Sequence, residues 1–180
     1  MNPTFKKILL IILFGCGFYL IDQYDGIQTT IRNVRISYSF PLLAFCSVIY
    51  GPVVGGCAGL LGQVIVQTGE LVPDWFAVIA TVLYCVMIGL FCRKIDIGSG
   101  FFSRQDATFF NKVHIGASVI IFQFFYPLLN IIFNKIGIRD ALTQGAIVSI
   151  DIVIGCMLLA TMFLALYAKT RISAANFYRS

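Results

Sequence analysis

Long runs of apolar residues alternate with short polar segments along the whole chain. With Gly, Pro and charged residues taken as turn markers, this pattern predicts six helical spans. The spans cover approximately residues 6–21, 38–50, 52–68, 75–92, 110–133 and 142–168. Since about 20 apolar residues cross the hydrocarbon core of a bilayer, little of the chain is left for a soluble domain. Residues 1–180 are therefore predicted to form one transmembrane domain, an all-α integral membrane protein with six helices.

Three spans have features of their own. The second and third are short and are separated only by Gly51 and Pro52, which predicts a helical hairpin whose turn lies at membrane depth and is covered by protein. The first follows Lys6 and Lys7 but lacks a small-residue cleavage site, so we interpret it as a retained helix and not as a signal peptide. In the fifth, Pro127 is expected to kink the helix because it removes a backbone donor.

Composition and charge agree with a membrane protein and predict its orientation. Charged residues make up 12% of the chain and hydrophobic residues 59%, whereas soluble domains carry about twice that share of charge. Cytoplasmic loops hold an excess of Lys and Arg, and with the N-terminus inside, nine of the 13 basic residues are cytoplasmic. These nine are Lys6, Lys7, Arg93, Lys94, Arg104, Lys112, Lys169, Arg171 and Arg179. Both termini are thus predicted to be cytoplasmic, and the net charge of +5 reflects topology and does not indicate a nucleic-acid partner.

Small residues recur at helical spacing around the predicted hairpin. Gly51, Gly55 and Gly59 are separated by four residues each, and Gly62 with Ala58 forms a second row beside them. Such rows let two helix backbones approach closely in a membrane. The pattern predicts close packing, either inside the bundle or against a partner subunit.

Polar residues lie at helical spacing in the outer halves of several spans. They are Gln63, Gln67, Trp75, Gln123, Tyr126, Asn130, Gln144 and Asp151. A mostly apolar site with a few convergent polar groups is typical of a small-molecule pocket. The alternative is that the amides hydrogen-bond one helix to another, while Trp75 and Tyr126 belong to the interfacial aromatic belt. For the whole set, the pattern favours a pocket.

Asp151 is the most unusual member of this set. It lies in the middle of the last apolar span, where an ionisable side chain costs roughly 2.5–3.5 kcal/mol on insertion scales and usually faces a cavity or a partner. We expect it to line the pocket and to accept a hydrogen bond from a ring N–H or an amine of the ligand. If it contacts the ligand, Asp151→Asn should weaken binding at least about tenfold.

Two loops carry further signals. The polar segment 22–37 is long enough to fold over the outer mouth of the bundle, and Asp22, Tyr24, Arg32 and Asn33 are its candidate gating residues. On the inner side, Ser103 precedes Asp106 by three residues, which is typical of a helix N-terminus. Either loop could instead be a plain solvated connector.

The sequence offers no catalytic constellation. It has no G-x-S-x-G, Walker A or HExxH motif, so uphill transport would need energy from another subunit. The six cysteines form no CxxC pair and are expected to act as small apolar residues, and the single histidine, His114, is expected to be a packed side chain. We therefore predict neither a metal nor a cofactor.

Most of the chain, from about Ile31 to Arg171, resembles a known family. The run ISYSFPLLAFCSVIYGPVVGGCAGLLG at residues 36–62, with Thr143-Gln144-Gly145 and the segment LYAKTR at 166–171, is similar to the riboflavin-type S components of energy-coupling factor (ECF) transporters. The resemblance implies a six-helix membrane protein of the bacterial cell membrane that binds a vitamin or precursor from outside, with segment 22–37 covering it. It also implies partners, a T subunit and two ATPase subunits, on which the S component topples to release its ligand.

Two function hypotheses from different classes follow. The leading one is an S component in which Trp75 and Tyr126 stack on a flat ligand and the amides bind its edges. Riboflavin is favoured by the family, while a thiamine precursor, pyridoxine or a queuine-like base stays possible. The alternative is a structural membrane subunit without a ligand of its own. A membrane-embedded enzyme is the least supported class.

Overall fold

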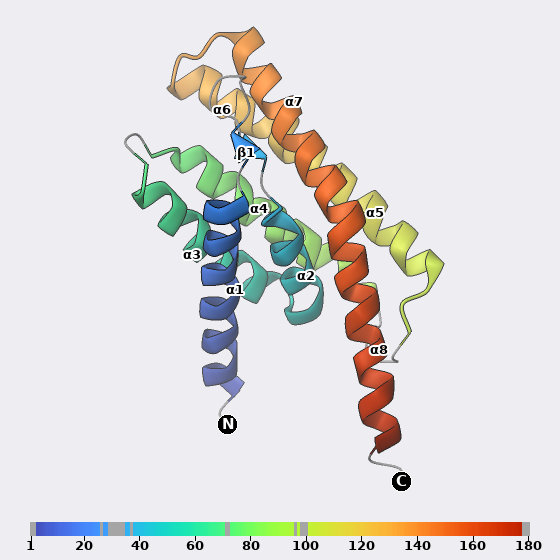
Figure 1. The fold of residues 1–180 in the computed structure, drawn as a ribbon. Coiled ribbons are helices and arrows are strands. Elements are labelled where there is room, and N and C mark those ends of the chain that lie inside the picture. The colour runs from blue at the N-terminus through green and yellow to red at the C-terminus, as the bar shows by residue number, and fades with distance from the viewer. Residues whose placement is uncertain are drawn as a thin grey trace.

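The computed structural model describes residues 3–25, 27–28, 35–36, 38–70, 73–95, 97 and 101–177. Helices dominate this part of the chain, and the predicted all-α class is confirmed (Figure 1). Four helices are long and apolar enough to cross a membrane, namely Pro3–Tyr24, Trp75–Lys94, Arg104–Phe133 and Ile138–Thr170. Two shorter apolar helices accompany them, Phe40–Tyr50 and Pro52–Thr68.

The first helix, α1 (Pro3–Asp25), continues beyond the predicted span. Because no Gly or Pro occurs between Ile21 and Gly26, the polar residues that follow the apolar run extend the helix by one turn. Asp22 and Tyr24, predicted as loop residues, therefore lie on α1, and Tyr24 is 88% exposed. Two short strands follow, β1 (Ile27–Gln28) and β2 (Arg35–Ile36), paired antiparallel. Arg32 and Asn33, the other predicted gating residues, lie outside the described residues.

A helical hairpin follows the two strands, with its first arm in the middle of the bundle and its second arm beside α1 (Figure 1). Its arms are α2 (Phe40–Tyr50) and α3 (Pro52–Thr68). At the turn, Gly51 has φ +88°, a conformation that glycine adopts at little cost, and its N–H donates to the Ser47 carbonyl at 3.0 Å. Pro52 then begins α3, where its missing N–H would have no helical partner.

The remaining chain forms α4 and two long helices with π-helical turns. The helix α4 (Trp75–Phe91) passes into the 3-10 turn η1 (Cys92–Lys94). The next rod consists of α5 (Arg104–Ser118), the π-helical segment η3 (Val119–Phe125) and α6 (Tyr126–Phe133). The last rod consists of α7 (Ile138–Gly155), the π-helical turn η4 (Cys156–Ala160) and α8 (Thr161–Phe177). Pro127 follows the wide η3 turn directly, so the irregular backbone lies where the proline removes a donor.

The start of α5 forms as the sequence predicts. Ser103 Oγ accepts from the Asp106 N–H at 3.1 Å, and Asp106 Oδ2 accepts from the Ser103 N–H at 3.0 Å. This reciprocal pair is a capping box. It adds two polar turns to the predicted fifth span, because a capped helix can extend beyond the apolar run that marks the membrane.

Close backbone approaches hold the hairpin in place. A Cβ atom at Gly62 would lie 2.8 Å from the Gly15 carbonyl oxygen, and one at Gly59 would lie 3.0 Å from Cys85 Sγ. Gly55 faces Ser47 across the hairpin, where a Cβ would lie 2.8 Å from the Ser47 Cα. The glycines thus lie at contacts of α3 with α1, with α4 and with α2.

The described start of α1 and the described end of α8 lie at the same end of the bundle (Figure 1). The opposite end contains the α3–α4 connection and the loop between α6 and α7 (Figure 1). We name this second end the Asp74 end, after the residue that precedes α4. The part of α5 around Asn111 and His114 lies away from it, and we name that part the His114 end.

Candidate functional site

Polar groups at the Asp74 end are organised by Asp74 itself. Its Oδ1 accepts from the N–H groups of Phe76 and Ala77 at 3.0 and 3.2 Å, which makes it the N-cap of α4. An N-cap carboxylate satisfies helix donors that otherwise have no partner. The helix begins at Trp75 for this reason, and the second carboxylate oxygen is left for another contact.

The same residue joins α4 to two other helices. Tyr126 Oη on α6 donates to Asp74 Oδ2 at 2.6 Å, and the Asp74 N–H donates to Gln67 Oε1 on α3 at 2.6 Å. Asp74 was not predicted as a site residue, although an Asp immediately before a long apolar run is a known N-cap signal. Only the fold shows that this cap also binds Gln67 and Tyr126.

Asn130 extends the network along α6. It is 2% exposed, and its Nδ2 donates to the Tyr126 carbonyl at 3.1 Å. Its Oδ1 accepts from Asn134 Nδ2 at 2.8 Å. Three of the predicted site residues, Gln67, Tyr126 and Asn130, thus belong to one hydrogen-bonded group, which we call the Asp74 cluster.

Three other predicted amides have no such partners. Gln63 is buried on α3, while Gln123 on η3 and Gln144 on α7 are half-buried. None of the three side chains forms a hydrogen bond with the described residues. These three amides therefore do not join the described helices to one another.

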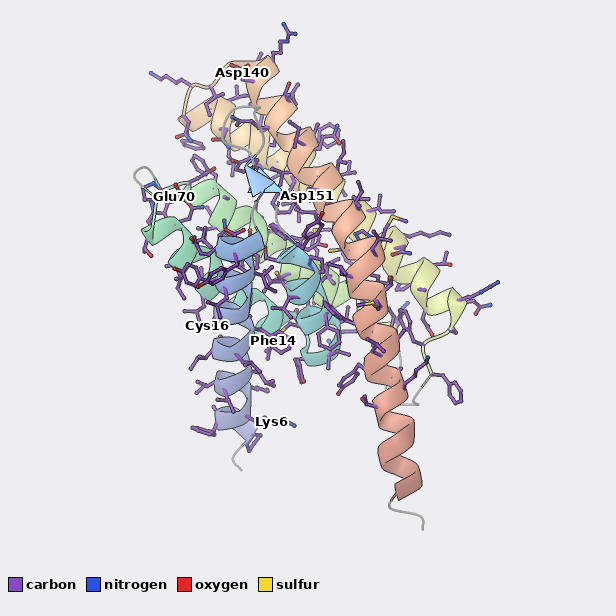
Figure 2. All side chains as sticks on the ribbon, viewed as in Figure 1. Lys6, Phe14, Cys16, Glu70, Asp140 and Asp151 are labelled. Carbon is purple, nitrogen blue, oxygen red and sulfur yellow. The ribbon has the colours of Figure 1, made fainter. Side chains whose placement is uncertain are left out.

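Trp75 and Asp151, the remaining predicted residues, lie in different surroundings. Trp75 is 55% exposed at the start of α4, a position that also suits the aromatic belt of a membrane protein. Asp151 is half-buried on α7 and takes part in an interaction within the protein. Figure 2 shows it in the lower part of α7, at the level of β1.

A group of aromatic rings lies in the interior between these helices. The Phe40 ring is half-buried, and its centroid lies 5.7, 5.9 and 5.4 Å from those of Phe18, Tyr84 and Phe122. All three contacts are edge-to-face, the preferred geometry of aromatic pairs. Because its neighbours come from α1, α4 and η3, Phe40 lies inside the bundle. We call these four rings the Phe40 platform. It was not predicted, because no sequence spacing relates rings from four separate segments.

A separate apolar groove runs between α2 and α8, with a volume of about 280 Å³. It is lined by Leu42, Phe45, Phe163, Leu166, Tyr167 and Thr170. The groove shares no residue with the Asp74 cluster, and its lining suits an apolar group better than a polar ligand.

Around His114 the described residues form a smaller contact between two helices, in which Ser118 Oγ lies 3.2 Å from both the carbonyl oxygen and the Oγ of Ser149. His114 is fully buried, its ring lies 5.3 Å from that of Phe110, and neither ring nitrogen has a hydrogen-bond partner. Among the described residues, no three His, Cys, Asp or Glu side chains gather as metal ligands. The six cysteines are free thiols, four of them buried.

The fold and its polar end describe an integral membrane protein, and comparison with known proteins identifies the family. The model of the ECF-type riboflavin transporter S component matches residues 17–169. The chain therefore belongs to the ECF-type riboflavin transporter S component family, as the sequence resemblance predicts. The protein is accordingly a substrate-binding transport subunit of the bacterial cell membrane.

Curated relatives carry a less specific name. A UPF0397 protein of Lactobacillus johnsonii is 30% identical over 175 residues, covering 96% of this chain and 95% of that protein. A UPF0397 protein of Enterococcus faecalis is 26% identical over 167 residues, covering 92% and 91%. One from Staphylococcus aureus strain JH9 is 28% identical over 172 residues, covering 95% and 94%. No solved structure matches the chain.

Proposed function

We propose that this protein captures a small vitamin or vitamin precursor at the Asp74 end and delivers it to a T subunit driven by two ATPase subunits. The observation that carries the proposal is the convergence of a glutamine from α3 and a tyrosine from α6 on Asp74, the N-cap of α4, together with three glutamines that form no hydrogen bond with the described residues. Family membership supports the transport role. Riboflavin is the first candidate ligand because the family model carries its name.

The Asp74 end is proposed to face the outside. In this orientation both termini are cytoplasmic, which agrees with the excess of Lys and Arg on that side. The described ends of α1 and α8 lie at the same end of the bundle, as such a topology requires. The predicted gating segment 22–37 would then connect α1 to α2 at the outer mouth.

The proposed ligand contacts are divided among three groups. Gln63, Gln123 and Gln144 would hydrogen-bond the ligand, since their amides are unused within the described part of the chain. Phe40 supports a flat ring better than Trp75 does, because Phe40 lies inside the bundle. Asp151 would accept from a ligand N–H or amine.

Ligand-induced stabilisation of the purified protein tests this function. The panel consists of riboflavin, thiamine, hydroxymethylpyrimidine, pyridoxine and a queuine-like base, each added in excess to protein in detergent. A compound at 100 times its Kd should stabilise the folded state by about 2.7 kcal/mol. We expect one compound to raise the melting temperature, and no shift with any of them would contradict the proposal.

Matched glutamine variants locate the binding site. Gln63→Ala, Gln123→Ala and Gln144→Ala should each weaken binding of the active compound, because each removes a free amide. Gln105→Ala is the control. Gln105 is exposed near the start of α5, at the opposite end of the α5–η3–α6 rod from Tyr126. Equal binding by all four variants would place the ligand elsewhere.

A structural subunit without a ligand is the second candidate. It is favoured by one observation: Gln67, Tyr126 and Asn130 already bond within the protein, as amides that only join helices would do. Mass spectrometry of small molecules that accompany the purified protein separates the two hypotheses. A retained heterocycle supports the S-component role, whereas a partner subunit without any retained small molecule supports the structural one.

A further inference from the structure

Asp74 restricts the direction in which its two neighbours can hydrogen-bond. A glutamine side chain can present either its carbonyl or its amino group, and a tyrosine hydroxyl can donate or accept. In the Asp74 cluster, Gln67 must accept because the backbone N–H of Asp74 only donates, and Tyr126 must donate because the Asp74 carboxylate only accepts. The bonding capacity that is left over on Gln67 and Tyr126 is therefore defined.

Gln67 is left as a donor. Its Oε1 accepts from the Asp74 N–H at 2.6 Å, so its Nε2, with two N–H groups, points to the other side of the amide. The side chain is 7% exposed, and Nε2 forms no hydrogen bond with the described residues. The fully enclosed polar atoms without a partner in this part of the chain belong to Asn111 and His114. Gln67 Nε2 thus keeps access to the surface and can donate to a ligand.

Tyr126 is left as an acceptor. It has one hydroxyl proton, and this proton is donated to Asp74 Oδ2 at 2.6 Å. Because the Asn130 side chain also interacts with Oη, one lone pair of Oη is left to accept from a ligand N–H. The hydroxyl cannot donate to a ligand carbonyl while Asp74 holds its proton. One donor and one acceptor are thus fixed by contacts with the same residue, Asp74.

We propose that Asp74 is a specificity-determining residue: by making Gln67 a donor and Tyr126 an acceptor, it selects a planar heterocycle whose edge carries an N–H beside a carbonyl or ring nitrogen. Lactam, imide and aminopyrimidine edges have this arrangement. Riboflavin, hydroxymethylpyrimidine, thiamine and a queuine-like base carry such an edge, whereas pyridoxine does not. The inference rests on the proposed function and narrows its ligand class.

The first test compares each ligand with an analogue that lacks the N–H. Riboflavin is paired with 3-methylriboflavin, and hydroxymethylpyrimidine with its 4-dimethylamino analogue. For the pair whose parent binds the wild-type protein, methylation should weaken binding about tenfold, because Tyr126 Oη loses its donor. Equal binding of parent and analogue would overturn the inference.

The second test reverses the polarity at Tyr126. In Asp74→Asn the remaining carbonyl can still cap α4, but an amino group replaces Oδ2 and donates to Tyr126, which frees the tyrosine proton. We expect the variant to bind the parent compound about tenfold more weakly and to lose the discrimination against the methylated analogue. The ratio of the two dissociation constants on one variant is independent of its folded fraction, so a less stable variant is still informative.

A double-mutant cycle shows whether Asp74 acts through Tyr126. Tyr126→Phe removes the acceptor directly, and Asp74→Asn should then have no further effect on the discrimination ratio. Gln105→Ala, far along the fifth rod, should keep the wild-type ratio. An Asp74→Asn variant that still discriminates in the wild-type background would overturn the inference.

Failure of the inference and failure of the proposed function give different results. If no compound of the panel binds the wild-type protein, the proposed function fails and the inference fails with it. If a compound binds but methylation or Asp74→Asn leaves discrimination unchanged, only the inference fails. Binding of pyridoxine alone also contradicts the inference while supporting the S-component role.

Discussion

The Asp74 end and the His114 end of the bundle both bury polar side chains, but the hydrogen bonding of these side chains differs. At the Asp74 end, carboxylate, hydroxyl and amide groups from three helices meet as donors and acceptors at 2.6–3.2 Å. At the His114 end, Ser118 bonds Ser149, but the two ring nitrogens of His114 and the Asn111 Oδ1 are enclosed without a hydrogen-bond partner among the described residues.

This difference has an energetic meaning. A typical hydrogen bond contributes only about 0.5–1.5 kcal/mol net, whereas a buried polar group without a partner costs about 1–3 kcal/mol. Polar residues at the Asp74 end therefore stabilise one arrangement of α3, α4 and α6. His114 and the Asn111 Oδ1 atom instead oppose folding in this conformation, and the apolar contacts around them, such as that of His114 with Phe110, must offset the cost.

Removal of the Asp74 side chain should have the largest effect on stability. Asp74→Ala deletes the cap of α4 and leaves Tyr126 Oη without its acceptor, for an expected loss of about 3 kcal/mol. Thermal unfolding in detergent, followed by circular dichroism, measures it. Asp106→Ala is the matched control, because Asp106 also caps a helix but joins no other one; it should lose about 1 kcal/mol. Equal losses would remove the contrast between the two ends.

Tyr126→Phe tests the hydrogen bond alone. The ring is kept, but Asp74 Oδ2 loses its donor, so we expect a loss of about 1.5 kcal/mol in the same unfolding experiment. Tyr24→Phe is the control, since Tyr24 is 88% exposed and should change stability by less than about 0.5 kcal/mol. A Tyr126→Phe protein as stable as the wild type would show that this hydrogen bond adds nothing to the fold.

A polar-to-apolar change at the other end should have the opposite sign. His114→Leu replaces a buried ring that has two unpartnered nitrogens with an apolar side chain of similar volume. The expected gain is about 1 kcal/mol in the free energy of unfolding. Destabilisation by the same amount would mean that the histidine contributes through its packing on Phe110, and the two ends would then be more alike than their hydrogen bonds indicate.

The smallest expected effect concerns Gly116, which follows His114 by two residues on α5. A Cβ at Gly116 would meet no atom within 4 Å, so Gly116→Ala should stabilise the helix by about 0.8 kcal/mol. Gly62→Ala provides the contrast, because its Cβ would lie 2.8 Å from the Gly15 carbonyl oxygen. We expect the first variant to melt higher than the wild type and the second to melt lower; stabilisation by both would contradict the packing described here.

Part of the candidate site was predictable from residue spacing. Helical periodicity places Tyr126 and Asn130 on one face of their span, and the position of Gln67 in the outer half of another span places it at the same depth. The partner that joins them, Asp74, was not predicted as a site residue, because it belongs to a helix start and no periodicity relates it to Tyr126, 52 residues away. The Phe40 platform was missed for the same reason.

The sequence by itself determined the helices, the hairpin turn at Gly51 and the capping box at Ser103, since hydropathy, turn residues and caps act over a few neighbouring positions. It also determined the family, because its residues match that family along most of the chain. Only the tertiary structure decided which buried polar groups are bonded and which are not. Those pairings depend on how three separate helices pack. The position of a polar residue in the sequence does not indicate whether a partner from another helix will lie within hydrogen-bond distance.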